Sequence, residues 1–97
     1  MMTVQDLPKA VLAVINNEQQ QVLAPNLDTQ IGNEGTTIRD VIRQLFQDNG
    51  VEIEFSGKGA YEKGVVIDMD TDHMQQMGLN PDALRFGQTV VRVENPS

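Results

Sequence analysis

Apolar residues at helical spacing predict a first helix over about residues 5–17. Pro8 suits the first turn of this helix, and Thr3 or Asp6 precedes it as a capping residue. The stretch over residues 16–35 is rich in Gln, Asn, Asp and Gly, and it predicts a short strand at most, near residues 22–25, followed by a loop. The apolar positions of the helix lie three or four residues apart and share one face: Leu7, Val11, Val14 and Ile15.

A second helix is the strongest element that the pattern predicts. Thr37 and Asp40 have the spacing of a capping box, and Asn49-Gly50 ends the periodic stretch. Charged and amide residues fill one side, which is typical of a helix that packs against a sheet. One apolar stripe runs along the other side, and we expect Ile42 and Phe46 to lie in the core: Ile38, Val41, Ile42, Leu45 and Phe46.

Strands are predicted after this helix. Apolar residues alternate with glutamates over residues 51–55, which indicates a strand with one wet face. Residues 56–64 are rich in glycine and predict a loop, and the apolar runs at residues 65–67 and 89–93 predict two more strands.

Two short turns are predicted between the last two strands. Thr71 is the expected cap of a helical turn that runs through Met77, and Gly78 ends it. Asn80-Pro81-Asp82 is a second cap-and-proline start, for a turn that Gly87 ends.

These elements predict a single α+β domain over residues 1–97, which is a common size for one domain. We expect a small two-layer domain in which two main helices pack on one face of a short sheet of three or four strands. A short sheet leaves unpaired edges, so we also expect a homodimer that forms through a strand edge or an apolar helix face.

The charge of the chain narrows the classes of partner. Fourteen acidic and seven basic residues give a net charge of -7, and the basic residues are scattered, which argues against nucleic acid as a partner. No run of about 18 apolar residues and no signal-peptide start occurs, so we expect a soluble cytoplasmic protein without a membrane partner. The absence of cysteine excludes disulfides, thiolate catalysis and cysteine-based zinc sites.

Three aspartates stand at alternate positions, as at the start of a calcium-binding loop: Asp68, Asp70 and Asp72. The sixth position of such a loop requires glycine and is His73, and the twelfth requires glutamate and is Leu79. We therefore interpret this segment as a solvated acidic turn with His73 at the surface, and predict no metal site.

The residues show no catalytic constellation. A histidine is the usual general base, but Ser56 does not lie in a nucleophile elbow that His73 could serve. The glycine-containing segment at residues 32–37 leads into a helix N-terminus, where a phosphate can bind, but Glu34 opposes an anion there and favours a plain entry loop. Neither a dinucleotide fingerprint nor a P-loop occurs. We predict no enzyme activity, no catalytic residues and no cofactor.

Five segments follow one another along the second half of the chain: TTIRDVI at 36–42, GVEIEF at 50–55, GKG at 57–59, EKG at 62–64 and VVRVENP at 90–96. In this order they resemble the C-terminal, substrate-binding part of the GDP-mannose 4,6-dehydratases, which are extended short-chain dehydrogenases. The resemblance covers about residues 36–97.

Catalysis in that family depends on a Rossmann domain for NADP and on a tyrosine–lysine pair four residues apart. This chain lacks both, because its one tyrosine is Tyr61 and residue 65 is valine. The resemblance implies a remnant of a nucleotide-sugar-binding lobe, with Lys58, Glu62 and Lys63 beside the ligand, and weak or no binding of the nucleotide sugar.

The function predicted from the sequence is thus a small, acidic, non-catalytic binding or interaction module. The alternative is an acidic protein-interaction adaptor or inhibitor, for example from a mobile genetic element.

Overall fold

The computed structural model describes residues 6–32 and 35–94. Helices and strands follow one another in this order: α1 (Leu7–Ile15), β1 (Val22–Ala24), β2 (Gln30–Ile31), β3 (Thr36–Thr37), α2 (Ile38–Asp48), β4 (Val51–Ser56), the 3₁₀ turn η2 (Gly59–Tyr61), β5 (Lys63–Met69), α3 (Thr71–Gln76), the 3₁₀ turn η3 (Pro81–Ala83) and β6 (Thr89–Val93). Among these described residues, no helix is long and apolar enough to cross a membrane.

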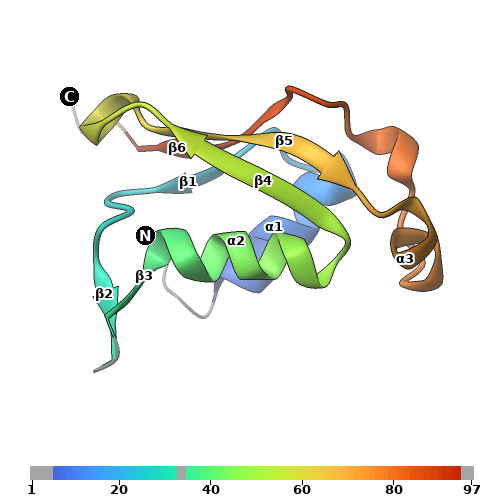
Figure 1. Cartoon of the computed structure of the whole chain (residues 1–97), viewed down its shortest axis with the longest axis horizontal. Helices are drawn as coiled ribbons and strands as arrows, with labels where there is room; N and C mark the ends of the chain where they lie inside the picture. The colour runs from blue at the N-terminus through green and yellow to red at the C-terminus, as the bar shows by residue number, and fades with distance from the viewer. Residues whose placement is uncertain (1–5, 33–34, 95–97) are drawn as a thin grey trace.

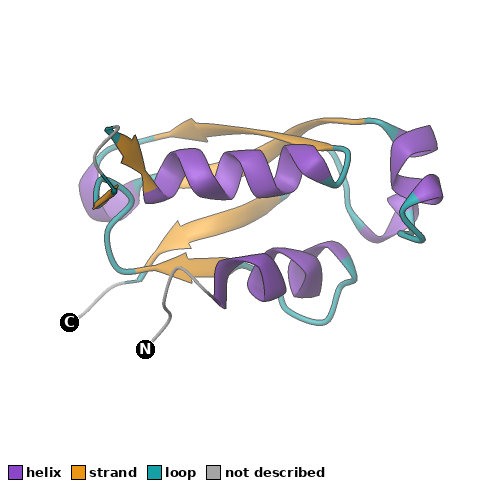
Figure 2. Ribbon diagram, turned by 90° about the horizontal axis from the view of Figure 1, so that it is seen from below, coloured by secondary structure: helices purple, strands orange, loops and turns teal. Residues whose placement is uncertain are grey.

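The main sheet has four strands in the order β1-β6-β5-β4. β1 runs parallel to β6, whereas β5 is antiparallel to both β6 and β4. The helices α1 and α2 lie on one side of this sheet, α3 lies at one end, and the short pair β2–β3 lies at the start of α2 (Figures 1 and 2). This arrangement confirms the predicted two-layer α+β fold with two main helices on a sheet of three or four strands, and the number of strands is four.

The core lies between the two main helices and the sheet. Ile42 and Phe46 of α2 are fully buried, with 0% of their surface exposed, which confirms the predicted core positions of this helix. Gly64 lies opposite both Phe55 and Val91, and a Cβ atom at Gly64 would come within 3.1 Å of either side chain. The remaining buried apolar residues come from both layers: Leu7, Ala10, Val11, Val14, Ile15, Val22, Ala24, Leu27, Val51, Ile53, Val66, Met74, Leu84, Val90 and Val91.

The start of α2 has the capping box that the sequence predicts. The backbone N–H of Asp40 donates to the hydroxyl of Thr37 at 3.3 Å, and the backbone N–H of Thr37 donates to the carboxylate of Asp40 at 3.1 Å. These bonds from Thr37 hold the pKa of Asp40 below its ordinary value. A lowered carboxyl pKa stabilises the fold while the group is ionised, so this contribution is present at neutral pH and is lost as the pH falls through the folded-state pKa.

Two predicted helix starts differ from the structure. The first helix covers residues 7–15, with Asp6 as a cap that makes no side-chain capping bond, and the alternative cap Thr3 lies outside the described residues. The cap of α3 is Asp70 rather than Thr71, because the carboxylate of Asp70 accepts the backbone N–H of His73 at 3.1 Å.

The extent of two predicted loops also differs. Residues 30–31 and 36–37 pair as β2 and β3, two strands too short to show an alternating pattern. The predicted loop over residues 56–64 is shorter, because Ser56 pairs with Lys63 and extends both β4 and β5. Lys63 therefore lies on a strand, and the remaining turn contains η2.

Candidate functional site

The three residues that the sequence proposes for ligand binding lie within six positions of each other in the chain but face different surroundings. Lys58 is exposed in the turn after β4, and Lys63 begins β5. Lys63 is exposed, whereas its neighbour Gly64 faces the core, so Lys63 projects from the side of the sheet opposite the helices. Glu62 instead reaches α2, on the helix side.

Glu62 is held by a two-pronged ion pair with Arg39 of α2. Arg39 Nε and Nη2 donate to the two carboxylate oxygens of Glu62, each at 2.6 Å. Arg39 Nη2 also donates to Asp28 at 2.8 Å. The Glu62 and Arg39 side chains are only 11% and 21% exposed, while that of Asp28 is 74% exposed. The hydrogen bonds to Glu62 and then to Asp28 raise the pKa of Arg39 above its ordinary value.

This ion pair joins three segments that are distant in sequence: the turn before β5, the helix α2 and the segment after β1. Both oxygens of Glu62 are already used as acceptors within the fold. We therefore assign Glu62 a structural role, which leaves Lys58 and Lys63 as the two residues of the predicted set without an ion pair to another described residue.

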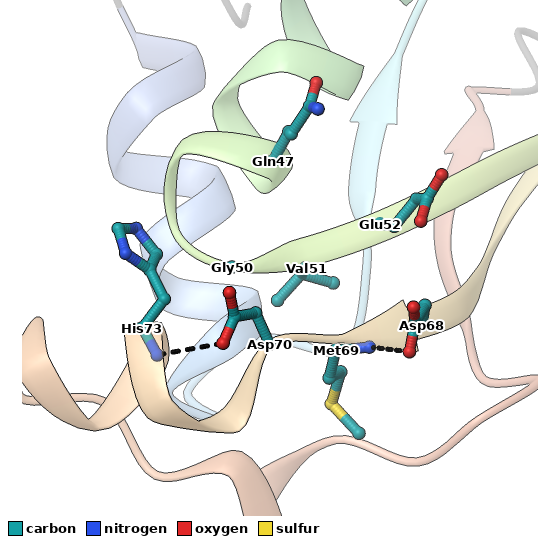
Figure 3. Close-up of a pocket in the computed structure, with 8 residues that line it drawn as sticks. All are labelled: Gln47, Gly50, Val51, Glu52, Asp68, Met69, Asp70 and His73. Carbon is teal, nitrogen blue, oxygen red and sulfur yellow. Dashed lines mark hydrogen bonds between the residues drawn. The ribbon is translucent and has the colours of Figure 1, made fainter.

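The acidic segment at the end of β5 borders an open cavity of about 360 Å³ (Figure 3). Asp70 caps α3, and Asp68 accepts the backbone N–H of Met69 at 2.9 Å, so two of the aspartates stabilise the local backbone. Asp72 is exposed in the first turn of α3. Within residues 6–32 and 35–94, no three His, Asp or Glu side chains lie close enough together to hold a metal ion. The cavity is lined by Gln47, Gly50, Val51, Glu52, Asp68, Met69, Asp70 and His73.

His73 is half-buried rather than at the free surface, which corrects the sequence-based expectation. Its Nε2 lies 2.8 Å from the backbone oxygen of Asp48, at the C-terminal end of α2. Its ring also packs beside Gly50, where an added Cβ would come within 3.2 Å of the imidazole. A histidine at this place satisfies a helix-end carbonyl, and this contact between α3 and α2 depends on the tertiary fold.

The glycine-containing segment at residues 32–37, which leads into the N-terminus of α2, is described only in part, because residues 33–34 lie outside the described residues. Its last residue, Thr37, is the cap of α2, where its hydroxyl already accepts the backbone N–H of Asp40.

The side of the main sheet that faces away from α1 and α2 is a surface that sequence reasoning missed. We call it the open face. Cross-strand register places its residues in three rows: Leu23, Arg92, Lys63 and Ser56; then Thr89, Val65 and Glu54; then Asp68 with Glu52, next to Ile67 at the bulge in β5. The alternation of apolar residues and glutamates along residues 51–55 predicts the acidic edge of this face. The sequence around Lys63 and around Arg92 does not show that these two basic residues lie beside each other.

The open face has an unusual distribution of charge. Lys63 lies directly opposite Arg92, and Glu52 lies directly opposite Asp68, so like charges are paired at both ends. Like charges in directly opposed strand positions destabilise a sheet. The face also exposes two large apolar side chains, Leu23 at 42% and Ile67 at 44%. Paired like charges and exposed apolar side chains both lower the stability of the fold, and such features are expected where a surface binds a partner.

A comparison with protein-family models finds no match for this chain, and a comparison with curated proteins also finds none.

Proposed function

We propose that the chain is a non-catalytic protein-interaction module whose binding surface is the open face of its four-stranded sheet. The observation that supports the proposal is the asymmetry of the two sheet faces. One face is covered by α1 and α2, and the other has no described helix over it, yet it exposes Leu23 and Ile67 among segregated charges. Binding of a partner covers these apolar groups and neutralises the paired like charges.

The two faces of the main sheet differ in the kinds of side chain that they carry. A sheet with one wet face ordinarily alternates buried apolar with exposed polar residues. The inner face follows this rule, as in Val51 and Ile53, whereas the open face mixes apolar and charged side chains. Exposed apolar groups beside charged ones are a composition that protein-binding surfaces use.

Capture from a lysate of the source cells tests this proposal. We compare the wild-type chain with Leu23→Glu/Ile67→Glu, which places two charges on the open face. The matched control is Leu12→Glu/Met77→Glu, since these residues are 40% and 50% exposed and lie on α1 and at the end of α3. We expect the wild type and the control to retain the same proteins, and the open-face variant to lose them by about tenfold or more.

Equal retention by the open-face variant contradicts the proposed surface. Enrichment of nothing over a bare matrix, by a chain that is also monomeric in solution, contradicts the proposed function. Circular dichroism of each variant checks that the fold is kept, since all four substituted side chains are exposed.

Binding of GDP-mannose is a separate prediction from the family resemblance. Lys58 and Lys63 are the cations of the matching turn, and a net charge of -7 repels a diphosphate at long range. We expect millimolar affinity, about 4 kcal/mol, or no binding, with any binding weakened by salt. The measurement is the shift of NMR signals from residues 57–65 during titration.

Lys58→Ala/Lys63→Ala is the control for that titration and should abolish the shifts. Micromolar affinity that survives both substitutions contradicts the assignment of these two lysines, and a complete lack of shifts removes the nucleotide-sugar part of the resemblance.

A further inference from the structure

We infer that the occupant of the open face is a second copy of this chain, stacked face to face about a two-fold axis. The inference rests on the proposed function, because it names the partner of the same surface. Its basis is the division of charge on this face. Lys63 and Arg92 form a basic end, and Glu52, Glu54 and Asp68 form an acidic end. A two-fold interface brings a surface against itself, so it requires self-complementarity of this kind.

The register of the strands shows how the two copies fit. Val65 stands in the middle row, between the row of Lys63 and Arg92 and the row of Glu52 and Asp68. A two-fold axis that lies between the stacked sheets and passes diagonally over Val65 places the row of Lys63 and Arg92 over strand β4 of the partner subunit. Lys63 of one copy then faces Glu54 of the partner subunit, and Arg92 faces Glu52 of the partner subunit.

This arrangement reduces the electrostatic conflict within each copy, because Lys63, Arg92 and Glu52 gain partners of opposite charge. In the isolated chain Lys63 and Arg92 repel each other, as do Glu52 and Asp68. Across the two-fold axis Lys63 and Arg92 meet Glu54 and Glu52 of the partner subunit, and this contact occurs twice in the dimer. Val65, which is half-buried in each copy, meets Val65 of the partner subunit at the centre of the interface. An apolar side chain gives up no hydrogen bond to water when it is covered there.

The alternative of pairing through the β4 edge of the sheet is opposed by the same glutamates. β4 is an edge strand, and its outward residues include Glu52 and Glu54. When two β4 strands pair antiparallel about a two-fold axis, Glu52 meets Glu54 of the partner subunit or Glu54 meets its own counterpart. Charged residues on an edge strand are a known protection against such pairing.

The size of the open face sets the expected strength of the contact. Four strands about 4.8 Å apart, with about five residues each at 3.3 Å, cover roughly 300 Å² in projection. A standard interface buries about 800 Å² per partner, so this contact belongs to the weak, reversible class. Because it depends on ion pairs at an exposed rim, salt should weaken it.

Sedimentation equilibrium of the full chain tests the inference. We expect a monomer–dimer equilibrium whose dissociation constant rises by about tenfold or more between ~0.05 M and ~0.5 M salt. Lys63→Glu/Arg92→Glu should be monomeric, and so should Glu52→Lys/Glu54→Lys, although the second variant has less net negative charge to oppose association. An equimolar mixture of these two variants should associate again, since each supplies the charges that the other lacks.

A matched pair of single variants controls for net charge. Arg92→Glu alters the open face, and Lys9→Glu makes the same change of charge at an exposed position of α1. Only Arg92→Glu should weaken the dimer. If a charge-reversed variant loses its fold by circular dichroism, the neutral variants Arg92→Gln and Glu54→Gln replace it and should weaken the dimer to a smaller extent.

The outcomes separate this inference from the proposed function. A chain that stays monomeric to millimolar concentration overturns the second copy as occupant, and the proposed function survives if Leu23→Glu/Ile67→Glu still loses captured proteins. A dimer that both charge-reversed variants retain also overturns the inference, because the contact then uses another surface. Restored association in the mixture supports it.

Discussion

Phe46→Ala should remove about 3–5 kcal/mol from the free energy of unfolding. Phe46 is fully buried in the last turn of α2, and its truncation leaves a cavity between the two layers that backbone movement closes only in part. Domains of this size have a total stability of about 5–15 kcal/mol, so the variant should retain only a fraction of it. Chemical denaturation followed by circular dichroism gives the free energy, and the melting temperature should fall by at least about 12 °C.

Leu12→Ala is the matched control for this measurement. Leu12 is 40% exposed on α1, and alanine is at least as good a helix former as leucine, so the change should stay within about 0.5 kcal/mol. A Phe46→Ala protein that unfolds at the wild-type denaturant concentration contradicts the packing of α2 against the sheet.

Arg39→Ala should have the second largest effect, a loss of about 2 kcal/mol. The substitution removes both hydrogen bonds to Glu62 and the bond to Asp28, and leaves the carboxylate of Glu62 without its cation in a largely covered position. Charge-assisted bonds of this kind contribute about 1.5–3 kcal/mol, and the partial exposure of Arg39 keeps the value below that of a fully buried pair. Denaturation curves provide the measurement.

Arg43→Ala is the control, because the Arg43 side chain, like that of Arg39, lies over the Phe55 ring but forms no ion pair with Glu62. The guanidinium carbons of Arg39 and Arg43 lie 5.9 and 5.3 Å from the centre of the Phe55 ring. Arg43 forms only a 3.4 Å pair with Asp40, with both side chains nearly half exposed, so its loss should cost less than about 1 kcal/mol.

Two further variants isolate the ion pair between Arg39 and Glu62. Arg39→Lys keeps the charge but cannot present two parallel donors, so it should recover only part of the loss. Arg39→Ala/Glu62→Ala should be less destabilised than the sum of the two single variants, because no unpaired charge is left. Equal effects of Arg39→Ala and Arg43→Ala contradict the structural role of Glu62, and make this carboxylate a candidate for ligand binding again.

Elements whose cause is local could be predicted from the amino-acid sequence. α2 could be predicted with its capping box and its buried Ile42 and Phe46, because capping and helical periodicity depend on residues within four positions of each other. The strand that begins at Val51 and the turn with Asn80 as cap were predictable for the same reason. The α+β class follows from these elements, since two amphipathic helices and an alternating strand must bury their apolar faces together.

The residues that the fold brings together from distant parts of the chain could not be predicted in this way. Glu62 was grouped with Lys58 and Lys63 by proximity in the chain, but the fold brings Arg39, 23 residues earlier, to its carboxylate. The sequence predicts His73 at the surface, whereas in the structure α3 places its ring against the backbone carbonyl of Asp48, the last residue of α2. The open face depends on the same kind of information, because Lys63 and Arg92 become neighbours through strand register. Register follows from how all strands bury one common face, which no single segment encodes.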